Sequence, residues 1–164
     1  MVFIDFDGVI LDTDKVIDSE FSGNGSRHDF LRDYDWFKLM RDDLIINNSL
    51  NYIKRSKYRV SLLSKFSSIR EGQAKIKYLR SKGILIDIHL VPTHIDKCDV
   101  VSASGNILID DKLSNLDIWS DRGGISIFFN KNGSNVDIHG ACNTKYPMIS
   151  DLSLLVLGTL KERG

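Results

Sequence analysis

The sequence predicts an α/β fold in which a central parallel sheet is covered by helices, with a small insertion after the first strand. Five short segments rich in β-branched and large apolar residues recur along the chain, and stretches with helical periodicity lie between them. Strands that alternate with helices form parallel sheets. The chain has 164 residues, of which 42% are hydrophobic, so we expect residues 1–164 to form one domain with a substantial core.

The expected strands are short, and most are nearly continuous in apolar residues, which is typical of strands covered on both faces. In chain order they are expected at residues 2–5, 58–63, 84–91, 107–109 and 125–129. The third strand partly alternates through Asp87 and His89. Because ligands of such sheets bind at the carboxyl ends of the strands, the chemistry is expected there.

Four helices are expected around these strands. Leu50 with Ile53 indicates the first. The second is indicated by the helical spacing of Ile69, Ile76 and Leu79 before Lys82 and Gly83, a plausible helix end. The third follows the fourth strand at residues 113–119. The fourth, at residues 151–160, is expected to be capped by Ser150.

The gap between the first two strands is too long for a simple crossover, and we interpret about residues 14–47 as a small cap-like insertion beside the active site. A glycine-rich loop is expected at residues 22–26, and one or two short helices within residues 30–44. Trp36 could stack on a base or anchor the insertion to the core. We favour the anchor.

Composition indicates a cytoplasmic protein. No apolar run approaches the length of a membrane span, and no basic flank precedes a long apolar stretch, so neither a membrane location nor export is expected. Cys98 and Cys142 lack metal-ligand spacing and fit reduced thiols. The histidines show no paired ligand spacing, which favours surface or loop roles over metal binding for His28, His89, His94 and His139.

The net charge is zero, but residues 51–82 form a basic block with ten Lys and Arg and only one acid, Glu71. Such a block can attract phosphate or nucleic acid. It can equally be the solvated faces of two helices, and this second interpretation is favoured.

Two groups of acids stand apart from the other aspartates by their position. Asp5 and Asp7 follow the apolar run Val-Phe-Ile, and Asp110 with Asp111 follow Ile-Leu-Ile. Several carboxylates gathered at one sheet edge repel one another unless a cation neutralises them, and Mg²⁺ is the hard, oxygen-seeking ion that fits best. Asp5 could attack a phosphorus atom, Asp7 could protonate the leaving oxygen, and Gly8 would permit the sharp turn that places them.

The segment from Asp5 to Thr13, Asp-Phe-Asp-Gly-Val-Ile-Leu-Asp-Thr, resembles the first motif of the haloacid dehalogenase (HAD) superfamily of phosphohydrolases. Val-Ser-Leu-Leu-Ser, ending at Ser64, resembles the second motif, Lys97 the third, and the acids at 110 and 111 the fourth. The resemblance implies a Rossmann-like three-layer sandwich in which Ser64 and Lys97 hold phosphate. It also implies Mg²⁺ ligands from Asp5, Asp110, Asp111 and the main-chain carbonyl of Asp7. Asp12, within the first motif, is expected to be a turn residue.

Other residues of the same types compete for two of these roles. Ser61, Ser67 and Ser68 are alternative hydroxyls to Ser64, and Lys65 and Lys112 are alternatives to Lys97.

Within the superfamily, the stretch from Lys97 to Asn130 is most similar to the 5′(3′)-deoxyribonucleotidase group, although the insertion is short for a cap that encloses a nucleoside. The similarity implies a small phosphorylated substrate, with nucleoside monophosphates favoured. Terminal phosphates of nucleic acid and a non-catalytic binding domain are the alternatives. The sequence does not indicate an oligomeric state.

Overall fold

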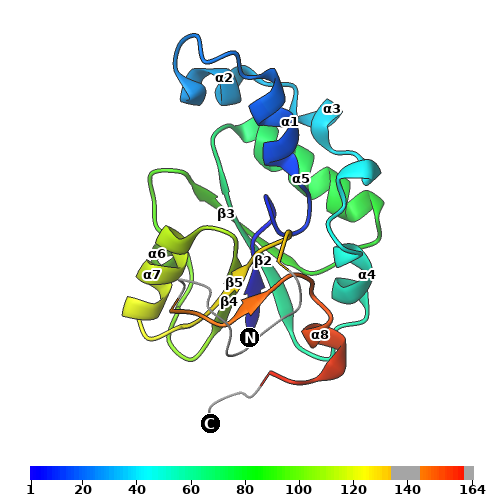
Figure 1. The fold of residues 1–164 in the computed structure, drawn as a ribbon, viewed down its shortest axis with the longest axis vertical. Coiled ribbons are helices and arrows are strands. Elements are labelled where there is room, and N and C mark those ends of the chain that lie inside the picture. Colours follow the sequence, from blue (N-terminus) through cyan, green and yellow to red (C-terminus); the bar gives the residue numbers. More distant parts are fainter. Residues whose placement is uncertain (134–144, 161–164) are drawn as a thin grey trace.

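A computed structural model of the protein describes residues 1–133 and 145–160. It contains a six-stranded sheet in the order β3-β2-β1-β4-β5-β6, and every neighbouring pair is parallel. Figure 1 shows the strands running through the middle of the molecule. The strands are β1 (Val2–Ile4), β2 (Val60–Phe66), β3 (Asp87–Pro92), β4 (Ile107–Asp110), β5 (Ile125–Phe129) and β6 (Met148–Ile149). The predicted α/β class with a parallel sheet is confirmed.

The strand positions differ from the prediction where pairing, not hydrophobicity, sets the boundary. β2 begins at Val60 and continues to Phe66, because its last three residues pair with Leu90–Pro92 of β3. β3 begins only at Asp87. The sixth strand, β6, was not predicted, since two residues paired to the end of β5 leave no pattern in the sequence.

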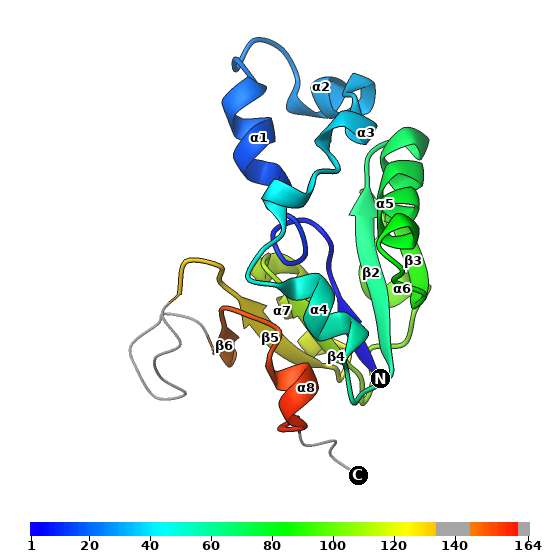
Figure 2. The ribbon, with the colours of Figure 1, turned by 90° about the vertical axis from the view of Figure 1, so that its right-hand side faces the viewer.

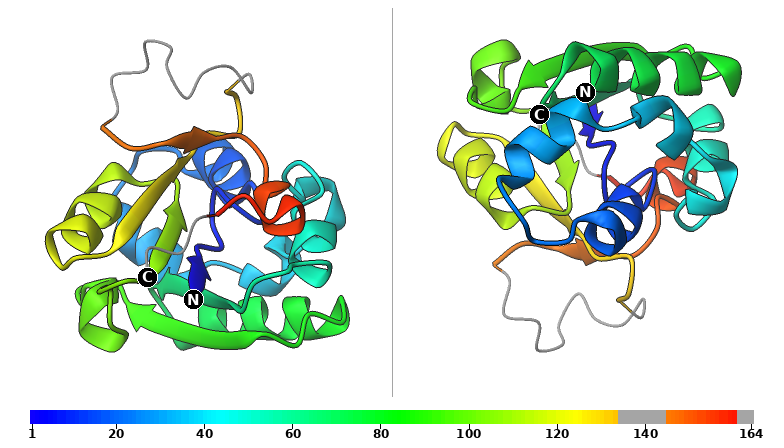
Figure 3. Two further views of the ribbon diagram at one scale, coloured as in Figure 1. Left: turned by 90° about the horizontal axis from the view of Figure 1, so that it is seen from below. Right: turned by 90° about the horizontal axis from the view of Figure 1, so that it is seen from above.

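Helices cover both faces of the sheet, and side chains alternate between the faces along each strand. Figure 3 shows α4 and α7 on opposite sides of the sheet. Phe3, Leu63 and Leu108 pack in a cluster with residues of α7, whereas Ile4, Leu62 and Ile109 pack in the larger cluster with α4, α5 and α8. The helices are α4 (Ser49–Lys54), α5 (Ile69–Ser81), α6 (Lys97–Val100), α7 (Leu113–Asp121) and α8 (Leu154–Leu157).

The segment after β1 supplies α1 (Thr13–Glu20), α2 (Arg27–Asp33), α3 (Trp36–Leu39) and a short 3₁₀ helix, η1 (Asp42–Leu44). Figure 2 shows α1, α2 and α3 beyond the carboxyl ends of the strands, with α3 beside α5. Helices were expected from residue 30, but α1 and the first residues of α2 were not predicted. Trp36 is buried, and its indole N–H donates to the carbonyl of Leu31 at 2.8 Å.

The C-terminal helix is much shorter than predicted. α8 covers only Leu154–Leu157, and Ser150 does not cap it. The Asp151 carboxylate instead accepts from the backbone N–H of Ser153, which forms a turn where a helix was expected. Gly158, with φ +77°, then ends the helix in the left-handed region.

None of the helices in residues 1–133 and 145–160 is long and apolar enough to cross a membrane. Cys98 is a free thiol, whereas Cys142 and His139 lie outside the described residues.

Candidate active site

Asp5 and Asp110 are brought together by the central pair of strands. β1 and β4 pair in parallel with Ile4 opposite Ile109, so the residues that follow at each carboxyl end lie side by side. β1 also pairs with β2 on its other side. The chain therefore continues from β1 to β2 in one direction across the sheet and from β4 to β5 in the other. This is the point in an α/β sheet at which ligands bind.

Three carboxylates form a compact cluster at this edge. Asp5, Asp110 and Asp111 each place one oxygen within 4.8 Å of the others. Burial, together with the negative charges of Asp5 and Asp110, raises the pKa of Asp111 to about 7. The cluster is therefore electrostatically costly in the absence of a cation.

Lys97 supplies part of the missing positive charge. It is the first residue of α6, and its Nζ lies 2.9 Å from Asp5 Oδ1 and 2.6 Å from Asp110 Oδ2. Burial alone would lower the pKa of Lys97, but the two carboxylates outweigh burial and raise it. Burial would raise the pKa of Asp5, but Lys97 and Lys75 hold it below its usual range.

The carboxylates of the cluster differ in how well their oxygens are satisfied. Asp110 accepts from Lys97 Nζ, from Asn115 Nδ2 at 2.9 Å and from the backbone N–H of Lys112 at 2.8 Å. Oδ1 of Asp5 and Oδ1 of Asp111 are buried and accept no hydrogen bond from the described residues, although Asp5 Oδ1 has its ion pair with Lys97. Unsatisfied buried carboxylate oxygens in one cluster are the donor set that a divalent cation requires.

Asp7 sits next to this cluster with both of its oxygens held. Thr13 Oγ1 donates to Oδ1 at 2.7 Å, and Lys75 Nζ donates to Oδ2 at 2.5 Å. Its side chain is 17% exposed, against 6% for Asp5 and 0% for Asp110. Asp7 is thus the acid among these three that is most open to solvent.

Gly8 allows the chain to turn sharply directly after Asp7. Its φ is +72°, and a Cβ at this position would lie 2.0 Å from Oδ2 of Asp111. Both the backbone conformation and the close approach of Asp111 therefore require glycine here.

Ser64 lies inside β2, not at its end, and is buried. Its hydroxyl contacts Lys75 Nζ at 3.2 Å, and through Lys75 it is linked to Asp7. The competing hydroxyls have other partners: Ser67 bonds Glu71, Ser68 caps α5, and Ser61 contacts the sulfur of Met1.

Among the competing lysines, Lys97 is the one that contacts Asp5 directly. Lys65 Nζ lies 3.5 Å from the carbonyl of Thr93 and 3.9 Å from Asp96. Lys112 is exposed; partial desolvation would lower its pKa, but the surrounding charges of Asp5, Asp111 and Asp14 raise it. Asp14 thus adds a further acid from α1 to the surroundings of the cluster.

Sequence reasoning missed Lys75, Glu71 and Asn115. Lys75 and Glu71 are buried on α5, where they form an i,i+4 ion pair at 2.6 Å. The apolar repeat had drawn attention to Ile69 and Ile76, yet these are 74% and 37% exposed. The available signal was the Glu-to-Lys spacing on the same helical face as the buried Tyr78 and Leu79.

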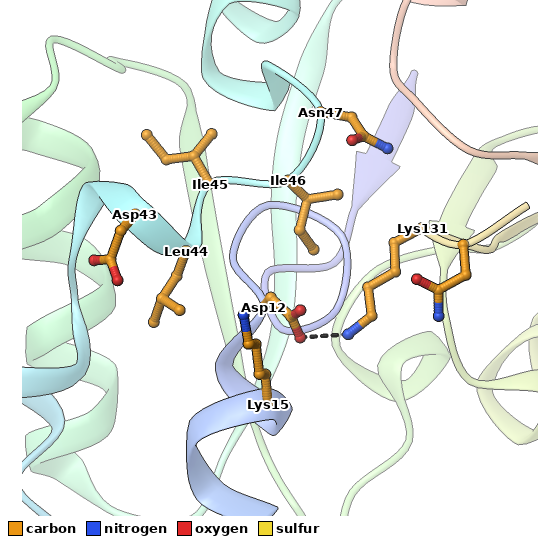
Figure 4. A pocket seen from close by; sticks show the side chains of 9 residues that line it. Asp12, Lys15, Asp43, Leu44, Ile45, Ile46, Asn47 and Lys131 are labelled. Atoms are coloured by element: carbon orange, nitrogen blue, oxygen red, sulfur yellow. Dashed lines mark hydrogen bonds and ion pairs between the residues drawn. The ribbon is translucent and has the colours of Figure 1, made fainter. Parts of the chain in front are cut away.

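A cavity of about 220 Å³ lies between the insertion and the segment after β5 (Figure 4). Lys131 reaches across it to form an ion pair with Asp12, which precedes α1 as its N-cap residue. The cavity is lined by Asp12, Lys15, Asp43, Leu44, Ile45, Ile46, Asn47, Lys131 and Asn132. Its lining combines charged and aliphatic side chains and includes no aromatic residue.

Solved structures with the same fold are hydrolases of the HAD group. HAD-hydrolase YfnB from Bacillus subtilis, solved bound to magnesium, has a TM-score of 0.63 at 13% identity, over 94% of this chain and 95% of that chain. For D,D-heptose 1,7-bisphosphate phosphatase from Burkholderia thailandensis the TM-score is 0.53 at 18% identity, over 96% of each chain. A haloacid dehalogenase-like hydrolase from Burkholderia xenovorans LB400 gives 0.58 at 14% identity, over 96% of this chain and 95% of that one.

No protein-family model and no curated protein matches the sequence. At these identities the structural likeness establishes a Rossmann-like fold of the HAD type.

Proposed function

We propose that this protein is a Mg²⁺-dependent phosphomonoester hydrolase that forms an aspartyl-phosphate on Asp5. The observation that carries the proposal is the cluster of Asp5, Asp110 and Asp111 at the switch point of the sheet, in which the buried Oδ1 of Asp111 has no hydrogen-bond donor among the described residues. Hydrolases of the HAD group with the same fold add support.

The residues present fit a magnesium ion. Asp111 would hold it through its unsatisfied Oδ1 and Asp5 through a carboxylate oxygen, with Asp110 and the main-chain carbonyl of Asp7 completing the protein ligands. When bound, the ion neutralises the cluster and the charge that develops on phosphorus oxygens.

Asp5 carries out the first chemical step. One carboxylate oxygen of Asp5 forms a bond to phosphorus while the bond from phosphorus to the leaving oxygen breaks. The leaving oxygen takes a proton from Asp7, whose partly exposed side chain lies two residues away. The products of this step are the free alcohol and the aspartyl-phosphate.

Water completes the cycle. It gives its proton to Asp7, bonds to phosphorus and releases inorganic phosphate, which restores the Asp5 carboxylate. We expect Lys97, which contacts Asp5, and Ser64, which contacts Lys75, to hold phosphate oxygens. An acid at position 7 favours a phosphatase over a dehalogenase, which has no leaving oxygen to protonate.

For the substrate we favour nucleoside monophosphates, on the resemblance of residues 97–130 to deoxyribonucleotidases. The terminal phosphate of a nucleic acid is less favoured, because the exposed cations at positions 54, 55, 57 and 59 precede β2 and so lie at the amino edge of the sheet. The catalytic acids lie at the opposite edge.

A phosphatase screen tests this proposal. The protein is assayed with a generic aryl phosphate, mononucleotides, sugar phosphates and 5′-phosphorylated oligonucleotides, each with Mg²⁺ and with EDTA. We expect Mg²⁺-dependent release of phosphate, fastest from mononucleotides. Absence of hydrolysis of every substrate would favour the non-catalytic binding domain, and preference for another class would overturn only the substrate assignment.

A further inference from the structure

Lys75, on α5, is a buried charge that the chemistry above does not use. Its side chain is 0% exposed, and its Nζ contacts four oxygens. These are Asp7 Oδ2 at 2.5 Å, Glu71 Oε1 at 2.6 Å, the carbonyl of Lys65 at 2.8 Å and Ser64 Oγ at 3.2 Å. A lysine is rarely buried without strong partners, and here those partners include a candidate catalytic acid.

Lys75 and Thr13 together fix the carboxylate of Asp7. Each donates to a different oxygen, Thr13 at 2.7 Å from the start of α1 and Lys75 at 2.5 Å from α5. A carboxylate held from both sides has little freedom to rotate about its Cβ–Cγ bond. The direction in which Asp7 presents a proton is therefore set by these two donors.

Lys75 is itself anchored to the start of α5 through Glu71. Oε1 of Glu71 accepts from Lys75, and Oε2 accepts from the backbone N–H and the hydroxyl of Ser67, at 2.8 and 2.6 Å. Ser68 caps the helix by accepting from the backbone N–H of Glu71. The Lys75 ammonium group is thus fixed through Glu71 to the N-terminus of α5, and its position does not depend on its own flexible side chain alone.

Aromatic rings enclose the same ammonium group. Nζ lies 5.5 Å from the ring centroid of Phe6 and 5.7 Å from that of Trp36. Trp36 belongs to α3 of the insertion and is 3% exposed. These rings exclude water from one side of Lys75 and strengthen its interaction with Asp7.

We propose that Lys75 is a positioning residue for Asp7: anchored by Glu71 and covered by Trp36, it orients the Asp7 carboxyl group toward the leaving oxygen. The inference rests on the proposed function and adds a residue to it. The competing interpretation is a structural ion pair that stabilises α5 against the sheet without affecting the chemistry.

Leaving-group dependence separates these two roles. A p-nitrophenolate leaves readily without a proton, whereas an alkoxide does not, so a misoriented Asp7 slows hydrolysis of an alkyl phosphate far more. The value of kcat/KM reports steps up to departure of the leaving group and is unaffected by later attack of water. A purely structural defect lowers the amount of active protein and reduces both values equally.

The test compares kcat/KM for p-nitrophenyl phosphate and glycerol phosphate in the wild type and four variants. Lys75→Met removes the donor. The double variant Glu71→Gln with Lys75→Met removes one buried charge of each sign. It leaves fewer unpaired buried charges than Lys75→Met alone, and so keeps the test possible if the single variant does not fold. Thr13→Val releases Asp7 from its other side, and Lys77→Met, an exposed lysine on the same helix, is the matched control.

We expect kcat/KM for glycerol phosphate to fall about 100-fold in the Lys75 variants and less than about 10-fold for p-nitrophenyl phosphate, as for loss of general acid catalysis. Thr13→Val should show the same pattern, and Lys77→Met should match the wild type. Equal falls on both substrates, or no fall, would overturn the role of Lys75 while leaving the proposed function intact. A wild type inactive on both substrates and on every mononucleotide would instead overturn the proposed function and this inference with it.

Discussion

At the scale of single residues, Asp111 carries the electrostatic cost of the acid cluster. Asp110 is more deeply buried than Asp111, and burial raises its pKa too, but it accepts hydrogen bonds from Lys97, Asn115 and a backbone N–H. Asp111 has an oxygen with no donor among the described residues, and its pKa is raised to about 7 by burial and by its acidic neighbours. Removal of the charge at Asp111 should therefore stabilise the metal-free protein. At Asp110 the same change would also leave Lys97 with one partner fewer.

The raised pKa of Asp111 predicts how stability depends on pH without metal. The pKa of an aspartate in an unfolded chain is about 3.9. Between about pH 4 and 7, Asp111 therefore binds its proton more tightly in the folded state than in the unfolded state. The contribution to stability is fully present below this window and is lost as the pH rises through it. We expect a loss of at most about 4 kcal/mol, because three pKa units are worth about 1.4 kcal/mol each.

Unfolding by urea in EDTA, at about pH 5 and about pH 7.5, measures this effect. The wild type should lose stability between the two pH values relative to Asp111→Asn, whereas Asp121→Asn, an exposed acid on α7, should follow the wild type. Mg²⁺ should restore the wild type at the higher pH and have little effect on Asp111→Asn. Parallel pH profiles for all three proteins would show that Asp111 is not the strained group.

Asp5→Asn tests the nucleophile. The amide nearly matches the carboxylate in shape but cannot attack phosphorus, and Lys97 keeps its contact with Asp110. We expect a folded protein whose turnover of an aryl phosphate is reduced by more than about 10³-fold. Asp12→Asn, in the same segment but paired with Lys131, should retain most activity. A folded Asp5→Asn protein with more than a few percent of wild-type turnover would rule Asp5 out.

At the scale of secondary structure, the sequence predicted those elements whose pattern is local. β1, β4 and β5 are buried apolar runs, and they lie where the runs are. The ends of β2 and the existence of β6 depend on pairing with a neighbouring strand, which a single segment does not encode. α8 is short because Asp151 forms a local turn that competes with the helix.

Some residues of the candidate site could likewise be predicted from local sequence, and others could not. Asp5, Asp7, Asp110 and Asp111 follow buried strands, so their convergence could be predicted from the parallel sheet alone. The spacing of Glu71 and Lys75 could have indicated an ion pair on the buried face of α5. The contact of Lys75 with Asp7 could not be predicted, because the two residues are 68 positions apart in the sequence. α5 was predicted, yet its buried face carries charged residues while Ile69 is exposed.

Trp36→Ala tests whether α3 anchors the insertion or selects the substrate. Trp36 is 3% exposed, its indole donates to the Leu31 carbonyl, and its ring packs against Tyr34 and Lys75. These contacts favour the anchor. We expect a loss of about 3 to 5 kcal/mol in the free energy of unfolding, as for other buried tryptophans.

The order of preference among nucleoside, sugar and aryl phosphates should stay the same in this variant. Phe37→Ala, the neighbouring and 41% exposed aromatic on α3, is the control and should cost much less stability. A changed order of substrates with unchanged stability would instead make Trp36 a residue that selects the substrate.

At the scale of the whole molecule, the parallel sheet separates two kinds of charge. All strands run in the same direction, so the acids that follow β1 and β4 lie at one edge and the chain that precedes β2 lies at the other. Arg59, just before β2, accepts a backbone hydrogen bond from Val2 at the start of β1, which confirms that it lies at the amino edge. The cations of residues 54–59 are thus far from where a phosphate would react.

Much of the rest of the basic block is engaged within the protein. Lys75 is buried against Asp7, Lys82 pairs with Asp42 of the insertion at 2.6 Å, and Arg80 donates to the carbonyls of Ile84 and Ile86. This distribution favours the interpretation of the block as structural and solvated helix faces over a continuous nucleic-acid surface.

Salt dependence tests this separation of charge. A polynucleotide bound along a basic surface loses affinity steeply as salt rises, with a slope of about 0.7 per phosphate contact for single strands, because counterions are released on binding. If only the terminal phosphate enters the site, kcat/KM for a 5′-phosphorylated oligonucleotide and for a mononucleotide should fall in parallel between about 50 and 200 mM salt. Replacing Lys54, Arg55, Lys57 and Arg59 together with Gln should leave both slopes unchanged. A steeper slope for the oligonucleotide that the fourfold variant abolishes would establish instead that the strand wraps from the catalytic edge to the amino edge, and that nucleic acid is the substrate.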